Sequence, residues 1–143
     1  MKKILSILIL ILIYLPLGAQ TIKEKDQYGK KLIYVDGSTI KERDQYGTKL
    51  YYLDGKTIKE KDQYGEKLYY IDGNTVKLRD QYGKKLMYFD GLMIKRKDQY
   101  GEKVYYLDGQ TLKYKDQYGK KIYYFETIPD KYVITCLIIS YFL

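Results

Sequence analysis

The fold of this chain is decided by an 18-residue stretch, residues 56–73, which reads KTIKEKDQYGEKLYYIDG. Its central tetrapeptide, Asp-Gln-Tyr-Gly, recurs at an unbroken spacing of 18 residues. The six copies begin at Asp26, Asp44, Asp62, Asp80, Asp98 and Asp116. A second mark, Asp-Gly, divides the units into halves and begins at Asp36, Asp54, Asp72, Asp90 and Asp108. A short unit copied at a fixed period is the signature of a repeat protein.

Each unit holds two segments of about six residues that are bounded by turn signals, and both segments favour strand over helix. An Asp-Gly pair between β-rich segments predicts a type I′ hairpin turn, in which both central residues have positive φ. Asp-Gln-Tyr-Gly has Asp at the first and Gly at the fourth position of a type I turn, where those residues are preferred. The sequence therefore predicts an all-β fold, an antiparallel meander of about 12 short strands with two per repeat.

The aromatic segment of each repeat is apolar on both faces, as in residues 68–71, Leu-Tyr-Tyr-Ile. A flat sheet of hairpins would leave one of those faces in solvent, so a flat sheet is disfavoured. We therefore expect tandem 18-residue β-hairpin repeats that form an antiparallel solenoid-like or ring-like (flower) array. In either array, stability comes from packing between neighbouring repeats.

The register of the strands follows from the turns. If both turns are two-residue connections, Ile58 lies beside Tyr51 and Tyr69 on one face, and Leu68 and Tyr70 lie on the other. A bulge at the Gly of Asp-Gln-Tyr-Gly would instead shift the register and exchange the faces. We expect the first register, because it keeps equivalent residues of every repeat on the same side.

The N-terminal segment, residues 1–19, differs from the repeat domain, residues 20–126. It begins with two lysines after Met1, continues as an aliphatic run and closes with Pro16 and small residues up to Ala19. This order is typical of a signal-peptide helix that is cleaved on secretion, with an uncleaved anchor as the alternative. We therefore expect an exported protein, either periplasmic, cell-surface or extracellular.

The last segment, residues 127–143, is an apolar C-terminal tail without an Asp-Gly mark. A turn signal, Ile128-Pro129-Asp130, precedes its apolar part. Three interpretations are open: a final strand that covers the open end of the array, a membrane-touching or partner-binding tail, or a reading-frame accident at the end of the gene. We favour the final strand.

The charge balance of the chain is basic. Removing residues 1–19 takes away Lys2 and Lys3 and no acid, so the formal net charge falls from +8 to +6. Such a balance favours anionic partners, which are acidic glycans, phosphate-rich envelope surfaces or nucleic acid, or else it serves solubility alone. Cys136 is the only cysteine, so no disulfide forms within the chain.

One tyrosine of the aromatic segment is the same in all six copies, whereas the residue before it varies among apolar types. The fixed positions are Tyr34, Tyr52, Tyr70, Tyr88, Tyr106 and Tyr124. In the expected register each lies near a fixed lysine, one of Lys23, Lys41, Lys59, Lys77, Lys95 and Lys113. An aromatic plane beside a cation suits a sugar ring or an anionic group, so these residues form the candidate ligand-binding site. The alternative is a structural cross-strand ladder in which lysine methylenes cover tyrosine rings.

The Asp-Gln-Tyr-Gly turn also keeps its Gln and Tyr in every copy, although a type I turn requires neither. The turn tyrosines are Tyr28, Tyr46, Tyr64, Tyr82, Tyr100 and Tyr118. We expect each of them to pack on the next hairpin. An exposed row of tyrosines for ligand stacking is the second interpretation.

Catalysis and metal binding find little support in the sequence. The chain has no histidine, and six copies of one unit supply no asymmetric pair of nucleophile and base. The repeated aspartates invite a calcium interpretation, but they sit at turns beside Gly, and calcium needs about six to eight oxygens close together. We expect no enzyme activity, no cofactor and no metal site.

The stretch from Tyr51 to Gly65, with its Asp-Gly and Asp-x-x-Gly turns and its Thr-Ile start, resembles the short hairpin repeats of the four-fold beta-flower proteins. The resemblance covers residues 21–125 and implies a small, often exported protein from a group mostly without known function. The segment from Lys49 to Gly55 is also similar to the aromatic strand of choline- and glucan-binding cell-wall repeats. Those repeats usually carry tryptophan in the ligand pocket, and this chain has none, so no choline site is implied.

Two functions are consistent with these patterns. The first is an exported non-catalytic repeat protein, a binding module for envelope or extracellular glycans or other polyanions through the tyrosine and lysine face. The second is a structural or protein-interaction scaffold that self-associates or recruits a protein partner through strand edges or the C-terminal tail. Neither needs a specific nucleic acid, and membrane contact is expected only through the signal peptide or the tail.

Overall fold

A computed structural model describes residues 19–142 of the chain. Ala19 is the only residue of the predicted signal peptide in that range, so the signal-peptide helix lies outside the described residues. Twelve strands and one helix are present among the described residues. They are β1 (Gln20–Glu24), β2 (Lys31–Asp36), β3 (Thr39–Glu42), β4 (Lys49–Asp54), β5 (Thr57–Glu60), β6 (Lys67–Asp72), β7 (Thr75–Leu78), β8 (Lys85–Asp90), β9 (Met93–Arg96), β10 (Lys103–Asp108), β11 (Thr111–Tyr114), β12 (Lys121–Phe125) and α2 (Lys131–Phe142).

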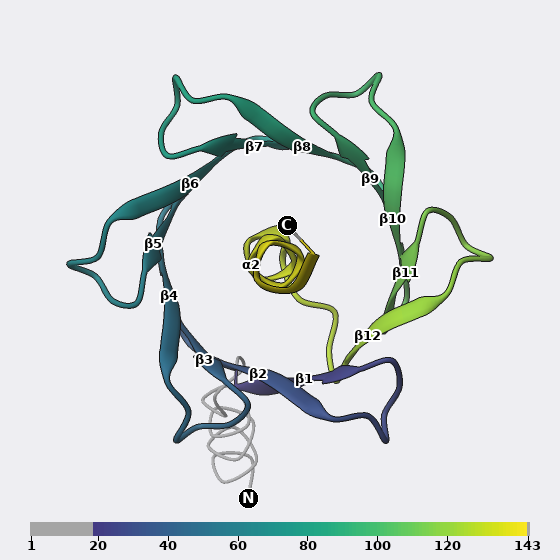
Figure 1. Cartoon of the computed structure of the whole chain (residues 1–143), viewed down its shortest axis with the longest axis horizontal. Helices are drawn as coiled ribbons and strands as arrows, with labels where there is room; N and C mark the ends of the chain where they lie inside the picture. The colour runs from purple at the N-terminus through teal and green to yellow at the C-terminus, as the bar shows by residue number, and fades with distance from the viewer. Residues whose placement is uncertain (1–18, 143) are drawn as a thin grey trace, which may run out of the picture.

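The strands close into a ring. Each strand pairs antiparallel with the next one along the chain, and β1 pairs with β12, where Lys23 lies opposite Tyr124. Figure 1 shows the loops of the hairpins projecting outward around a central helix. The predicted number of strands is confirmed, and of the two arrays left open by the sequence the structure is the ring.

The predicted inward face is confirmed, although one connection differs. The outward placement of Leu68 does not hold for its equivalents, since Leu32, Leu50, Leu86 and Val104 pack against the core and Ile122 belongs to it. Ile58 pairs with Leu53 across the Asp-Gly turn and with Tyr69 across the Asp-Gln-Tyr-Gly turn, so these apolar residues share one face. Beyond that pair the register shifts, and Lys59 lies opposite Lys67. The Asp-Gln-Tyr-Gly connection is therefore a longer loop with a bulge, not the two-residue turn that we expected. The faces do not exchange, because the bulge lies between the Ile58–Tyr69 pair and the loop.

The Asp-Gly turns also differ from the prediction. Asp54 lies opposite Thr57, which leaves Gly55 and Lys56 as the two central residues. Only the glycine of this turn has positive φ, between 57° and 62° in the five copies. A positive φ at the first central residue alone is the pattern of a type II′ turn, so the predicted type I′ turn is wrong. The aspartate precedes the turn instead of forming its first central residue.

The Asp-Gln-Tyr-Gly segment has the predicted turn positions. The Gly65 N–H donates to the Asp62 carbonyl at 2.9 Å, so Asp is first and Gly is fourth. The Asp62 carboxylate accepts a further bond from the Tyr64 N–H at 2.9 Å. A Cβ placed on Gly65 would lie 1.6 Å from the Glu60 carbonyl oxygen. The loop therefore folds back too closely for any side chain at this position.

The interior of the ring is filled by α2, which Figure 1 shows at its centre. Strand residues such as Ile22, Ile58 and Leu112 are fully buried, and so are Leu137 and Ile138 of the helix. These side chains belong to one connected apolar core. The hydrophobic core of the protein is thus the contact between the ring and its own C-terminal segment.

The interpretation of residues 127–143 as a final strand is wrong, because residues 131–142 form a helix. The pairing of β1 with β12 leaves no open end for a strand to cover. Inside a closed ring a strand would also leave its backbone groups unpaired, whereas a helix pairs its own N–H and C=O groups. Asp130 caps this helix by accepting bonds from the Tyr132 and Val133 N–H groups at 3.0 and 3.1 Å. Over residues 19–142 no helix combines the length and the apolarity needed to cross a membrane.

Contacts with α2 explain why one inward position varies between repeats. Tyr51 and Ser140 share a hydrogen bond of 2.8 Å, and the Tyr123 hydroxyl donates to the Leu137 carbonyl at 3.3 Å. The equivalent residue of the fourth repeat, Met87, is buried. A helix has no six-fold symmetry, so each repeat meets a different part of its surface. The inward position is accordingly Ile in one repeat, Met in another and Tyr in the remaining four.

The thiol of Cys136 supplies a test of this packing. Cys136 is 1% exposed, and burial, with a smaller contribution from Asp130, raises the pKa of its thiol. A raised pKa leaves little thiolate, which is the reactive form. We expect no reaction with a thiol reagent in the native protein and full reaction in denaturant. The control is Ser38→Cys in a Cys136→Ser background, which puts the thiol on an exposed turn and should react at once; rapid labelling of native Cys136 would contradict the packing.

Candidate functional site on the petals and the outer face

The site residues predicted from the sequence meet on the outer face of the ring. Tyr52 lies opposite Thr39 on one neighbouring strand and opposite Lys59 on the other. The pairing continues through the closure, where Tyr124 lies opposite Lys23. We call these residues the outer ladder; its members are Tyr34, Tyr52, Tyr70, Tyr88, Tyr106, Tyr124, Lys23, Lys41, Lys59, Lys77, Lys95 and Lys113. The six tyrosines are half-buried, so they do not form an exposed row.

The lysines of the outer ladder already have partners. Lys59 Nζ lies 2.8 Å from an Asp54 carboxylate oxygen and donates to the Gln63 carbonyl at 3.0 Å. Five repeats have the ion pair, at 2.6–3.4 Å. All six have the bond to the turn carbonyl, at 2.9–3.0 Å. These contacts favour the structural alternative for the ladder, because a lysine with two internal partners has little capacity left for a ligand.

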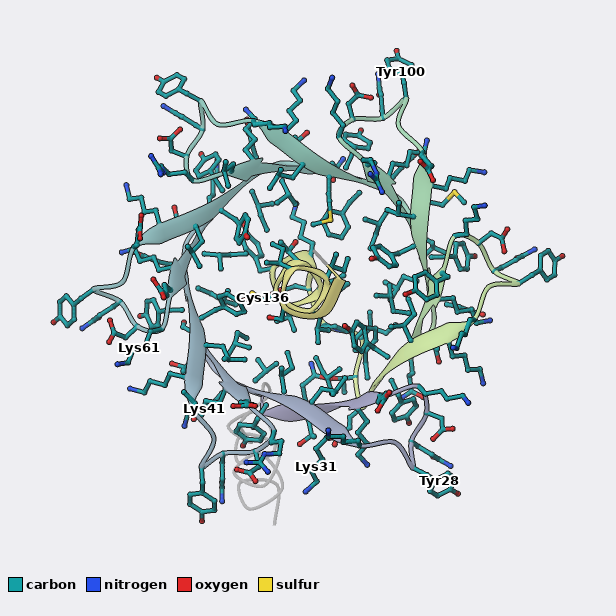
Figure 2. All side chains as sticks on the ribbon, viewed as in Figure 1. Tyr28, Lys31, Lys41, Lys61, Tyr100 and Cys136 are labelled. Carbon is teal, nitrogen blue, oxygen red and sulfur yellow. The ribbon has the colours of Figure 1, made fainter. Side chains whose placement is uncertain are left out.

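The loops that contain Asp-Gln-Tyr-Gly project outward from the ring, and we call them petals. Their residues are 25–30, 43–48, 61–66, 79–84, 97–102 and 115–120. The tyrosine of every petal is 86–87% exposed, and Figure 2 shows Tyr28 and Tyr100 pointing away from the ring at two tips. The expectation that this tyrosine packs on the next hairpin is therefore wrong. The bulge bends each petal out of the ring wall and leaves the exposed row of tyrosines.

Each petal begins with a Lys or Arg at positive φ, a feature that sequence reasoning missed. These residues are Lys25, Arg43, Lys61, Arg79, Lys97 and Lys115, with φ of 62–68°. The Lys61 N–H donates to the Leu50 carbonyl at 2.9 Å, and the Asp62 N–H donates to the Glu60 carbonyl at 2.7 Å, so hydrogen bonds fix this conformation. Left-handed backbone costs about 1–2 kcal/mol for a residue other than glycine. A cation stands at this position in all six copies, where Gly or Asn would be less strained.

The exposed charge is unequal around the ring. The strand residue that precedes each petal is exposed in all six repeats. In chain order these residues are Glu24, Glu42, Glu60, Leu78, Arg96 and Tyr114. The last three petals are neighbours in the ring, so the half without these glutamates is continuous and more basic.

A petal can contact a sugar face and an acidic group together, because it has an exposed tyrosine ring three residues after an exposed cation. Within residues 19–142 no three His, Cys, Asp or Glu side chains group closely enough to hold a metal ion. Comparisons of the chain with protein-family models, with curated proteins and with solved structures find no match. The resemblance to the beta-flower repeats therefore stays a prediction.

Proposed function

We propose that this protein is an exported, non-catalytic binding module, a ring that holds an acidic polysaccharide through several petals at once. The observation that carries the proposal is the row of petal tyrosines, each 86–87% exposed and each three residues after a Lys or Arg at positive φ. Tyrosine combines an apolar ring with a polar hydroxyl and is enriched at interaction surfaces for that reason. The tyrosine ring stacks on a sugar, and the cation pairs with a carboxylate or sulfate of the same polymer.

The petals are suited to binding one polymer through several weak contacts. Bonds inside each petal, such as that from the Gly65 N–H to the Asp62 carbonyl, fix the turn, so little conformational entropy is lost on binding. A polymer that touches one petal is held close to the next, and linked contacts raise affinity by about 10²–10⁴-fold. An extended polymer is therefore a better ligand than a monosaccharide.

The outer ladder supports the petals in this proposal. Lys59 donates to the carbonyl of Gln63, which precedes Tyr64 in the petal. Its second partner, Asp54, lies at the Asp-Gly end of the same hairpin, so the lysine ties the petal to the wall of the ring. The half-buried ladder tyrosines offer a secondary contact surface on the same outer face.

Polysaccharide is favoured over other partners for three reasons. Every petal carries an acidic residue, which opposes the closely spaced phosphates of a nucleic acid. If residues 1–19 direct export, acidic polysaccharides are the abundant polyanions that the ring meets. The scaffold alternative has less support, because β1 and β12 pair with each other and Val133 to Ile138 of the tail are buried in the ring.

The petal tyrosines of the more basic half test the proposal. Changing Tyr82, Tyr100 and Tyr118 together to alanine is expected to lower the affinity for polygalacturonate and heparin about tenfold or more, because three linked contacts are lost. These side chains are exposed, so the ring should still fold. Affinity is measured by isothermal titration calorimetry, and folding is checked by circular dichroism.

The matched control changes the three tyrosines in the half of the ring that carries the glutamates. These are Tyr28, Tyr46 and Tyr64. Both variants lose three exposed tyrosine side chains. A smaller loss of affinity in the control than in the first variant therefore identifies the basic half as the main contact. Wild-type affinity in the first variant, or equal affinity of the wild type for neutral dextran, would contradict the proposal.

A further inference from the structure

A cavity between the fourth and fifth petals has a different character from the petal tips. Its volume is about 350 Å³, and Leu86, Met87, Val104 and Tyr105 form its apolar wall. Ile138 of α2, which is fully buried, also lines it, so the cavity reaches from the petals to the central helix. Volumes of about 300–1,000 Å³ with mostly apolar walls are typical of small-molecule sites.

Positive charge surrounds this apolar space. Lys84, Lys85, Arg96 and Lys97 line the cavity, and no acidic residue among those described does so. The four cationic residues are exposed, whereas Ile138 is buried. The charge therefore lies at the mouth of the cavity and the apolar surface lies inside.

The lining of the cavity includes two residues that differ from those of the other repeats. Met87 and Arg96 lie opposite each other on β8 and β9. The equivalent pair in the second and third repeats is Tyr51 and Glu60. Around the whole ring this cross-strand pair joins an unbranched apolar side chain to a cation only at Met87 and Arg96.

Two other places in the ring show what this pair changes. At the next position the pair is Tyr105 and Tyr114, whose rings stack with centroids 5.9 Å apart. Between the sixth and first petals a cavity of about 530 Å³ has Glu24 among its lining residues, at the position that corresponds to Arg96. The combination of an apolar interior with a purely cationic mouth therefore belongs to the cavity beside Met87.

We propose that this cavity binds an amphiphile with a single aliphatic chain and an anionic headgroup. The chain packs against Leu86, Val104 and Ile138, and the flexible side chain of Met87 adapts to it. The headgroup, a phosphate, sulfate or carboxylate, lies beside Arg96 and the neighbouring lysines, where charge-assisted hydrogen bonds form. A polysaccharide has no aliphatic chain, so this site is separate from the function proposed for the petals.

The test uses dodecyl phosphate below its micelle concentration and the full chain with labelled methyl groups. We expect the Met87 and Ile138 methyl signals to shift and to saturate at one equivalent of ligand. The double variant Met87→Tyr, Arg96→Glu introduces the pair found at Tyr51 and Glu60. Its folding is checked by circular dichroism, and it is expected to lower the affinity about tenfold or more. Arg96→Glu alone, which leaves the apolar wall intact, should lower it in the same direction.

Further experiments test whether the headgroup is needed, where the ligand comes from, and whether the cavity binds independently of the petals. Dodecanol should bind more weakly than dodecyl phosphate. If the protein sediments with vesicles of anionic phospholipid, the source of the ligand is a membrane lipid. If it binds dodecyl phosphate but does not sediment with the vesicles, the source is a free amphiphile. The variant without the tyrosines of petals four to six should still bind dodecyl phosphate. Unchanged binding by the double variant, equal binding of dodecanol, or no binding of dodecyl phosphate would overturn the inference.

Discussion

Replacing Leu137 by aspartate is expected to unfold the ring. Leu137 is fully buried on α2 and belongs to the core that joins the helix to the strands. Even a change from leucine to alanine at such a site costs about 2–5 kcal/mol, and an unpaired buried charge costs more. A domain has a total stability of only about 5–15 kcal/mol, so the loss should exceed what this ring can tolerate.

The matched control for this change is Ile128→Asp. Ile128 precedes the helix and is 60% exposed, so the same kind of substitution there should alter stability by less than about 0.5 kcal/mol. Urea unfolding followed by circular dichroism, together with size-exclusion chromatography, compares the two variants. A folded Leu137→Asp variant with the urea midpoint of the wild type would show that α2 does not form the core of the ring.

The change from Gly65 to alanine is expected to cost more than about 3 kcal/mol, which is in the upper range for single substitutions. An added Cβ would lie 1.6 Å from the Glu60 carbonyl oxygen and 2.7 Å from its carbon, and both atoms belong to the backbone. Relief therefore requires the petal to open. Opening would strain the bond from the Glu60 N–H to the Glu66 carbonyl, which closes the loop at 2.9 Å.

Gly55→Ala is the control, because it adds the same methyl group at the neighbouring Asp-Gly turn, between β4 and β5. No atom lies within 4 Å of a Cβ placed there, and the substitution meets only the strain of φ at 60°. Its cost should be about 1–2 kcal/mol. Urea unfolding midpoints of the two variants decide the comparison, and equal midpoints would contradict the close approach of the petal backbone.

Local signals in the sequence were sufficient to predict the strands and the residues of their inward face, but not the bulge that turns Leu32, Leu50 and Leu86 toward the core. The Asp-Gly and Asp-Gln-Tyr-Gly marks placed the turns, and the period-2 pattern put Ile58 and Tyr69 on one side, where they are paired. The choice between ring and solenoid could not be made in this way, because both arrays repeat the same hairpin. Closure depends on how far each hairpin rotates relative to the next, and no single residue encodes that rotation.

The C-terminal helix was missed because residues 131–142 are apolar on all sides. An apolar segment of this length is compatible with a buried strand as well as with a buried helix, and its periodicity cannot separate them. The deciding fact is tertiary: every strand of the ring already has two neighbours. Asp130, at the N-cap position before the apolar run, was the one local signal for a helix.

The candidate site was predicted in part. The pairing of Tyr52 with Lys59 is confirmed, but the ion pair of Lys59 with Asp54 was not foreseen, although the two residues recur at a fixed separation of five. The cation at the start of each petal had a visible signal, since position 61 and its equivalents are always Lys or Arg. The positive φ of that residue had no signal in the sequence, because Lys and Arg do not favour that conformation.

Closure of the ring is tested most directly by backbone nuclear Overhauser contacts between β1 and β12 in the monomer. Lys23 lies opposite Tyr124 there, and the Lys25 N–H donates to the Ile122 carbonyl at 2.7 Å. A closed ring predicts cross-strand contacts at this junction as strong as those between Tyr52 and Lys59 within the second hairpin. Contacts between successive strands alone, with none between the first and the last, would contradict the ring.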